Sequence, residues 1–226
     1  MNISKVFDHR ICIVTGHYGT GKTEFAVNLS LELAKEHDNV MIADLDIVNP
    51  YFRSRERKTE LEKAGIKMIS SSQEAAHADI PALPAELLSI FQNRDIRGIL
   101  DIGGDPVGAR VLARFQPKII SENYELLFVV NANRPEVRTV DAAIEYMRKI
   151  EATTGLTCSG LVNNTHLCGE TTEAEVRKGA ALAKAIGDET GIPVRCHVAV
   201  ERLAESLADL NEPVFPISIK MKKPWE

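Results

Sequence analysis

The most constraining feature of this sequence is the stretch GHYGTGKT (16–23), which directly follows the apolar run ICIVT (11–15). The stretch has the spacing G-x-x-x-x-G-K-[ST], in which a glycine-rich turn leads from a strand into a helix. Glycines let backbone N–H groups point at phosphate oxygens, and a helix starting near Gly21 adds partial positive charge. In this arrangement Lys22 reaches the β- and γ-phosphates, and the Thr23 hydroxyl ligates magnesium. The sequence therefore predicts a phosphate-binding loop.

A dinucleotide-binding loop is the main alternative for the same glycines. The stretch GTG (19–21) could begin a G-x-G-x-x-G pattern, and acidic residues follow about 20 positions later. However, Glu24 stands where that pattern needs glycine or alanine, and the pattern gives Lys22 and Thr23 no role. We therefore expect one continuous set of nucleotide-binding residues: Gly16, His17, Tyr18, Gly19, Thr20, Gly21, Lys22, Thr23 and Glu24.

Short apolar runs recur along the chain and alternate with longer segments of helical periodicity. Several runs are almost continuously apolar, which is typical of strands buried on both faces of a parallel sheet. The expected strands cover residues 10–15, 39–44, 66–70, 97–102, 125–130, 157–162 and 192–198. The expected helices include 22–35, 135–150 and 171–190. This alternation predicts a single α/β domain over residues 1–226, with a mostly parallel central sheet flanked by helices.

Acidic residues follow two of the expected strands and are the candidates to complete the site. Asp44 and Asp46 leave one strand on alternate positions, so both carboxylates could face the same side. Asp101 ends another strand, and the glycines at 103–104 free the backbone to approach or leave a γ-phosphate. Either set could simply cap a turn at a strand end. Because the phosphate loop is also present, a shared magnesium and hydrolysis site is favoured.

Four segments occur in an order that resembles a known family: GHYGTGKT (16–23), DLD (44–46), ILDIGGD (99–105) and GLVNNTH (160–166). Together they resemble the ParA/MinD/nitrogenase-iron-protein group of P-loop ATPases. The chain is also similar to the CobQ/CobB nucleotide-binding domains. The resemblance runs from about residue 10 to about residue 205. It implies a three-layer P-loop NTPase fold with ATP and Mg²⁺ as ligands.

The resemblance also implies a role for each acidic residue. Asp46 matches the aspartate that orients the hydrolytic water, so Lys22 and Asp46 are the expected catalytic residues. Asp44 matches its partner two positions earlier. Asp101 matches the Walker B aspartate, and the glycines at 103–104 match the second switch segment. The implied residues of the magnesium shell are Thr23, Asp46 and Asp101.

The position of the base is implied in the same way. Asn164 falls where relatives hydrogen-bond adenine with an asparagine amide, a group that both donates and accepts. The stretch RCHV (195–198) matches the loop that borders the base, which makes Arg195 a candidate contact. The guanine-type N-K-x-D pattern is absent, so ATP is favoured over GTP. A simple strand-to-helix turn is the alternative interpretation of the asparagines at 163–164.

One position departs from the family's pattern. Relatives that bind ATP between two subunits carry a lysine where this chain has His17, and that lysine reaches the other subunit's phosphates. Histidine is shorter and only partly charged near neutral pH, so the resemblance leaves a homodimer open. His17 is either a weaker donor or an ordinary loop residue. Tyr18 replaces the next glycine and could pack on a neighbouring loop or on a partner.

Two sets of arginines follow the expected switch segments. The run RSRERK (53–58) could contact phosphates, nucleic acid or a partner that reads the switch. Arg110 and Arg114 could supply charge to a transition state. A solvated helix surface is the simpler interpretation of both sets.

Composition excludes several classes of protein. The net charge of −5 and the pI of about 5.8 argue against a nucleic-acid partner. No apolar stretch is long enough to cross a bilayer, and three prolines in 212–226 oppose a membrane-bound helix there. That segment is expected to be a solvated tail or an edge strand, and the protein to be cytoplasmic. The cysteines form no CxxC pair and are absent from 101–125, so neither zinc nor the iron–sulfur cluster of the nitrogenase relative is expected.

The sequence thus favours a magnesium-dependent ATPase that binds ATP and ADP and acts as a nucleotide switch or maturation factor for a partner protein. Two alternatives remain. One is an ATP-dependent amide-forming ligase of the CobB or dethiobiotin-synthetase type, in which residues 70–84 would line a pocket for a small-molecule substrate. The other is a nucleotide-binding scaffold with little turnover.

Overall fold

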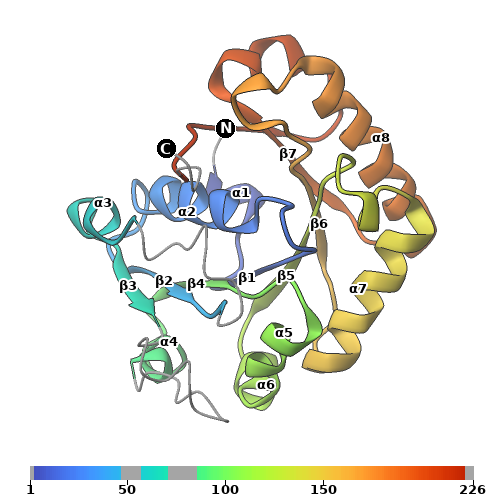
Figure 1. Ribbon diagram of the computed structural model, residues 1–226. Helices are drawn as coiled ribbons and strands as arrows, with labels where there is room; N and C mark the ends of the chain where they lie inside the picture. The colour runs from blue at the N-terminus through green and yellow to red at the C-terminus, as the bar shows by residue number, and fades with distance from the viewer. Residues whose placement is uncertain (1–2, 47–56, 71–85, 222–226) are drawn as a thin grey trace.

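The computed structural model describes residues 3–46, 57–70 and 86–221 of the chain (Figure 1). In these residues, eight parallel strands form one sheet in the order β3-β2-β4-β1-β5-β6-β7-β8. The strands are β1 (Ile11–Thr15), β2 (Val40–Asp44), β3 (Lys67–Ser70), β4 (Arg97–Asp101), β5 (Tyr124–Val130), β6 (Gly160–Asn163), β7 (Val194–Val200) and β8 (Val214–Ile217).

Helices cover both faces of this sheet, so the fold has three layers (Figure 1). One face carries α1 (Ile3–Val6), α2 (Lys22–Leu33) and α3 (Lys58–Lys63). The other carries α4 (Leu87–Gln92), α5 (Pro106–Ala113), α6 (Gln116–Ile120), α7 (Val140–Thr154) and α8 (Glu173–Thr190). A separate hydrophobic cluster fills each interface between sheet and helices. The expected α/β class, with a parallel sheet between helices, is confirmed.

The central strands explain why the sequence runs are continuously apolar. All residues of β1 are buried, and in β5 every residue after Tyr124 is buried. β1 pairs in parallel with β4 on one side and with β5 on the other, so neither of its faces meets solvent. Because every strand runs the same way, the carboxyl ends of all strands lie at one edge of the sheet.

The expected strands match the observed ones within three residues at each end. The largest difference is at β6, which begins at Gly160 rather than at 157. There the backbone N–H of Cys158 donates to the Glu151 carboxylate at 2.8 Å instead of to a neighbouring strand. The helix expected over 135–150 is divided into a 3₁₀ turn, Pro135–Val137, and α7, because Thr139 caps α7 with its side chain. The predicted edge strand near the end of the chain is β8.

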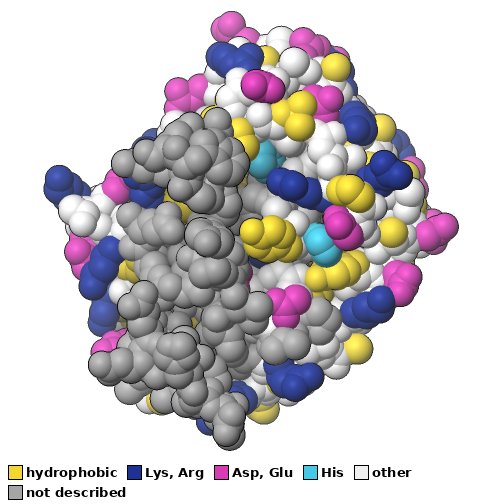
Figure 2. All heavy atoms as spheres, viewed as in Figure 1, with side chains coloured by type: hydrophobic (Ala, Val, Ile, Leu, Met, Phe, Trp, Pro, Cys, Tyr) yellow, Lys and Arg dark blue, Asp and Glu magenta, His cyan; other side chains and the backbone are white. Residues whose placement is uncertain are grey.

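None of the helices in the described ranges is long and apolar enough to span a membrane. Lys/Arg and Asp/Glu side chains are interspersed on the described part of the face in Figure 2. Arg110 and Arg114 are exposed, as expected if they lie on a solvated helix surface. Most of the 53–58 run and nearly all of the 70–84 segment lie outside the described residues.

Three phenylalanines join the two ends of the described chain to the helix that follows the glycine-rich loop. The Phe25 ring on α2 packs edge-on against Phe7 and Phe215, with ring centroids 5.7 Å apart in both pairs. All three side chains are almost completely buried. Phe25 therefore links the segment after α1, helix α2 and strand β8.

We predict that Phe25→Ala lowers the free energy of unfolding by about 3–5 kcal/mol, because it removes a buried ring from both aromatic pairs. Urea denaturation followed by circular dichroism measures this loss. Ile120→Ala is the control, since Ile120 is 52% exposed and its loss should stay below about 0.5 kcal/mol. Equal losses in the two variants would contradict this account of the core.

Candidate functional site

The loop between β1 and α2 has a backbone that only glycine accommodates. Gly16, Gly19 and Gly21 have φ angles of 144°, 75° and 82°. A Cβ atom at Gly16 would lie 2.5 Å from the Val129 carbonyl oxygen, and one at Gly21 would clash with the Asn164 amide. The predicted strand–turn–helix context of the motif is thus present, and each of the three glycines is required by local geometry.

Side chains from two other strand ends fix this loop in place. Arg134, after β5, donates from Nε to the Gly19 carbonyl oxygen at 2.6 Å. Asn164, after β6, donates from Nδ2 to the carbonyl oxygens of Thr20 and Gly21, at 3.0 and 3.1 Å. Within the loop, the Thr20 hydroxyl donates to the His17 carbonyl oxygen at 2.9 Å. The loop conformation is therefore set by neighbouring strands as well as by its own sequence.

Lys22 is buried at the start of α2, and its Nζ donates to the His17 carbonyl oxygen at 3.2 Å. Burial lowers the pKa of Lys22, and nearby carboxylates act against that effect. These carboxylates, in order of effect, belong to Asp101, Asp46 and Asp105. The predicted lysine and the predicted acidic residues therefore meet at one edge of the sheet.

The three predicted acidic residues are all buried at this edge. Asp44 and Asp101 are register partners on adjacent strands, and the backbone N–H of Asp46 donates to Asp44 Oδ1 at 3.2 Å. Burial, followed by the charge of Asp44, raises the pKa of Asp101 to about 8, although Lys22 and the Thr23 hydroxyl oppose this. The neutral form of the Asp101 carboxyl is therefore favoured in this structure, and a cation beside it would favour the ionised form.

Carboxylates next to a threonine hydroxyl are the oxygen ligands that Mg²⁺ prefers. In the described residues, no three His, Cys, Asp or Glu side chains converge as a metal cage. In phosphate-transfer sites magnesium is usually bound through one or two carboxylates together with substrate phosphates. The oxygen donors of Thr23, Asp46 and Asp101 thus fit Mg²⁺, and these three are the candidate residues.

The glycine pair after β4 lies directly on the phosphate loop. A Cβ atom at Gly104 would lie 2.7 Å from both the Gly16 carbonyl oxygen and Lys22 Nζ. A Cβ atom at Gly103 would lie 3.2 Å from Asp46 Oδ1. The Tyr146 hydroxyl, from α7, donates to the Gly104 carbonyl oxygen. The second predicted switch segment therefore contacts the loop, the lysine and an acidic residue at once.

A cavity of about 610 Å³ opens beside the phosphate loop, within the usual size range of small-molecule sites. Its lining contains seven of the predicted nucleotide-binding residues, Tyr18, Gly19, Gly21, Lys22, Thr23, Glu24 and Asn164, and also the predicted catalytic residue Asp46. The remaining lining comes from residues that follow β5 and β6, from the last residues of β7 and β8, and from the segment after β8. Gly16, His17, Thr20 and Asp101 do not line it, and Thr20 and Asp101 are buried.

The His17 side chain contacts residues of its own chain. Its ring packs edge-on against Tyr146, with centroids 4.8 Å apart, and Nδ1 lies 3.0 Å from the Tyr18 carbonyl oxygen. The Glu136 carboxylate is 3.9 Å away. Tyr18 is 54% exposed at the mouth of the cavity. The homodimer considered from the sequence stays a prediction.

The expectation that Arg195 borders the base is wrong. The RCHV stretch is not a loop but part of β7, and Arg195 lies near its amino end, at the opposite edge of the sheet. There its Nε lies 2.8 Å from Glu125 Oε1, and its guanidinium also donates to the Val6 carbonyl oxygen. The cavity is lined instead by the residues that end this strand, 198–200.

Sequence reasoning missed three contributors to the site: Arg134, His166 and the segment after β8. Arg134 and His166 each follow the carboxyl end of a strand. Because residues that follow parallel strands meet at one edge of the sheet, the reasoning that predicted the acidic residues could also have predicted these two. Burial, with the charge of Arg134 adding to it, lowers the pKa of His166 to about 4. The segment after β8 gave no such signal, because it reads as a proline-containing tail.

The chain shares its fold with solved P-loop proteins. It superposes on FtsY from Thermotoga maritima with a TM-score of 0.56 at 22% identity, covering 81% of this chain and 59% of that one. Chloroplast FtsY from Physcomitrella patens gives a TM-score of 0.56 at 16% identity, covering 81% of this chain and 56% of that one. The 54 kDa signal recognition particle protein from Aeropyrum pernix, in complex with GDP, gives a TM-score of 0.52 at 21% identity. The match covers 82% of this chain and 40% of that one.

These comparisons establish the P-loop NTPase fold. The chain spans only 40–59% of the length of the three structures, and its identity to them is low. No protein-family model matches the sequence, and no curated protein matches it.

The Glu125–Arg195 pair at the opposite edge makes stability depend on pH. Burial raises the pKa of Glu125 to about 7, against the opposing effect of Arg195. The folded state therefore holds a proton that the unfolded state has already lost above pH of about 4.5, so this contribution to stability falls as the pH rises to about 7.

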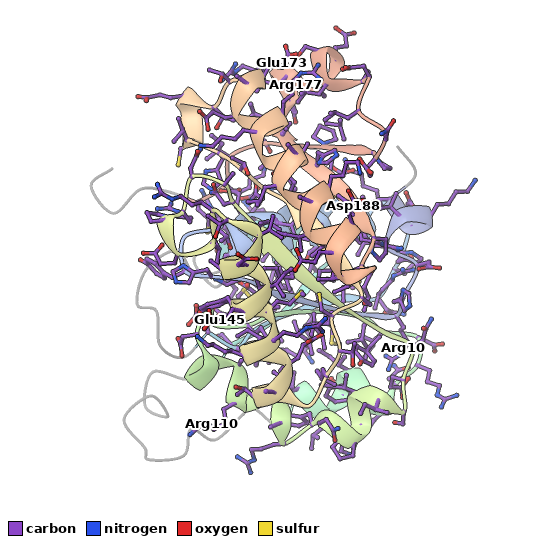
Figure 3. The ribbon with its side chains drawn as sticks, turned by 90° about the vertical axis from the view of Figure 1, so that its right-hand side faces the viewer. Arg10, Arg110, Glu145, Glu173, Arg177 and Asp188 are labelled. Carbon is purple, nitrogen blue, oxygen red and sulfur yellow. The ribbon has the colours of Figure 1, made fainter. Side chains whose placement is uncertain are left out.

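We predict that the stability difference between wild type and Glu125→Gln declines by up to about 1.4 kcal/mol per pH unit over this window and is flat above it. Thermal or urea unfolding from pH 5 to 8 measures it. Glu145→Gln, an exposed carboxylate on α7 (Figure 3), should give a difference that does not change over this range. The same flat profile for Glu125→Gln would contradict a raised pKa.

Proposed function

We propose that this chain is a magnesium-dependent ATPase of the ParA/MinD/nitrogenase-iron-protein group, folded as one nucleotide-binding domain over residues 1–226, that acts as a nucleotide switch. The observation that carries the proposal is the meeting of the glycine loop, buried Lys22 and the carboxylates of Asp46 and Asp101 at one edge of the sheet. Such a constellation serves phosphoryl transfer by positioning and charge.

Each residue has a role that follows from its position. Lys22 would leave the His17 carbonyl oxygen and bind the β- and γ-phosphates, since its ammonium group already lies inside the loop. Thr23, Asp46 and Asp101 would hold a magnesium ion, which supplies neutralisation of the phosphate charge. Asp46, beside the glycines after β4, would also orient the attacking water.

The switch would consist of the segment that carries Gly104. This glycine lies against Gly16 and Lys22, where a γ-phosphate would bind, so a triphosphate and the present position of the segment compete for the same space. A diphosphate would leave the contact intact. Binding energy of the γ-phosphate would thereby move one loop between two positions, which a partner protein could read.

Adenine is favoured over guanine by the lining of the cavity. Guanine presents N–H donors that a carboxylate would normally accept. Among the described lining residues, the carboxylates are Glu24, which accepts backbone N–H groups, and Asp46, which lies beside Lys22. The N-K-x-D pattern is also absent from the sequence. GDP is bound in the Aeropyrum structure, but 21% identity gives no ground for transferring that base to this chain.

Calorimetric titration with Mg·ATP and Mg·GTP, together with phosphate release, tests the proposal. We predict binding of Mg·ATP that Lys22→Ala weakens about 10- to 100-fold, because charged hydrogen bonds to the phosphates are lost. Lys35→Ala removes an exposed lysine after the same helix and should change little. Undetectable binding of both nucleotides, or equal binding by the two variants, would refute the function.

The switch has a separate test in Gly104→Ala. The added methyl group cannot fit 2.7 Å from Gly16 O and Lys22 Nζ, so the γ-phosphate would no longer have to displace the segment. We predict that the affinity for ATP relative to ADP rises about 3- to 10-fold. Gly169→Ala, where the same group meets open space at the cavity, is the matched control. An unchanged ATP-to-ADP ratio in Gly104→Ala would contradict the switch.

A further inference from the structure

The segment that follows β8, residues 218–221, forms one wall of the cavity; we call it the strap. Ile217, at the end of β8, and then Ile219 and Met221 in the strap line the cavity. Every second residue thus faces the same side, as in an extended chain. The lining also includes the residues at the end of the neighbouring strand β7, 198–200, where Val200 is the register partner of Ile217. The end of β7, the end of β8 and the strap thus form an apolar wall of the cavity next to the phosphate loop.

Two side chains of α2 hold the strap through its backbone. Glu24 Oε1 accepts the N–H of Lys220 at 2.7 Å, and Glu24 Oε2 accepts the N–H of Met221 at 3.0 Å. One helical turn later, Asn28 Oδ1 accepts the N–H of Ser218 at 3.3 Å. The Asn28 amide also donates to Glu24 Oε1 at 3.0 Å, which orients the carboxylate. Both ligating side chains lie on one helix face because they are four residues apart.

The other contacts of the strap are weaker or less specific. Lys220 Nζ pairs with Glu60 on α3 at 2.7 Å, but both side chains are partly exposed, and such pairs contribute little. Met221 packs against the cluster between α2 and the sheet. The carboxylate of Glu24 is therefore the main determinant of where the strap lies.

The strap exposes apolar surface beside the cavity. Ile219 is 46% exposed, although it is one of the large apolar side chains. A flat heteroaromatic ring packed against the strap and the end of β7 would cover this surface and gain the free energy of its burial. The phosphate loop is adjacent, since Glu24 directly follows Lys22 and Thr23 on α2.

We propose that Glu24, supported by Asn28, is a positioning residue for the nucleobase: it fixes the strap as the apolar wall on which the base of a bound nucleotide packs. Glu24 acts through the strap and does not touch the nucleotide, unlike the direct contact expected from the sequence. This inference rests on the proposed function, because it requires a nucleotide with its phosphates in the loop.

The role separates binding of the base from binding of the phosphates. Loss of Glu24 should weaken ligands that carry a base and spare those that consist of phosphates alone. The test compares Mg·ATP with magnesium tripolyphosphate by calorimetry, for the wild type, Glu24→Ala and Glu24→Gln. We predict that Glu24→Ala raises the dissociation constant for ATP about 10-fold, and that for tripolyphosphate by less than about 2-fold. Glu24→Gln keeps the shape and one acceptor oxygen, so its dissociation constant for ATP should lie between those of the wild type and Glu24→Ala.

A matched control and a second measurement protect the test from folding defects. Glu32→Gln removes another carboxylate of α2, one that pairs with Lys35 and does not touch the strap, and should leave both affinities unchanged. In the wild type, amide hydrogen exchange of residues 218–221 should slow more with Mg·ATP than with tripolyphosphate.

The outcomes discriminate between the two proposals. Equal losses for both ligands would show that Glu24 acts on the phosphate loop, and unchanged ATP affinity would show that the strap is not the base wall; either result overturns this inference alone. If the wild type binds neither ATP nor tripolyphosphate, the proposed function fails as well.

Discussion

The site depends on how the carbonyl oxygens of the glycine loop are held. Arg134 and Asn164, from two different strand ends, donate to the carbonyl oxygens of residues 19–21. A loop with three glycines has many accessible states of its own, and these bonds select one of them. Everything else at the site is arranged around that fixed loop: Lys22 inside it, the acidic residues beside it and the Gly104 segment on top of it.

Parallel topology explains why so much of this arrangement could be predicted from the sequence. Once the apolar runs are read as parallel strands, the residues that follow them must share one edge, and this placed Asp46 and Asp101 near the loop correctly. The wrong expectation for Arg195 came from the resemblance and not from this reasoning, which had already placed residues 192–198 in a strand. A shift of a few residues along a strand moves a side chain from one edge of the sheet to the other.

Contacts made by sequence-distant side chains could not be predicted. Nothing local in the sequence shows that the Tyr146 hydroxyl donates to the Gly104 carbonyl oxygen. Nor does it show that the Glu24 carboxylate accepts the backbone N–H of Lys220, which lies 196 residues further along the chain. Both depend on which helix packs next to which strand end. The strap after β8 was predicted only as part of a tail, because the prolines of 212–226 oppose a helix there. The strap itself, residues 218–221, contains no proline, and its role as an extended wall depends on the contacts of Glu24 and Asn28.

The central claim is that the γ-phosphate and the Gly104 segment compete for one position. Amide hydrogen exchange of residues 102–105, compared between Mg·ADP and Mg²⁺ with a non-hydrolysable ATP analogue, tests it most directly. The account predicts that the diphosphate leaves exchange in this segment close to that of the protein without nucleotide, while the triphosphate analogue changes it. Identical exchange with the two nucleotides, both bound at saturation, would contradict the account.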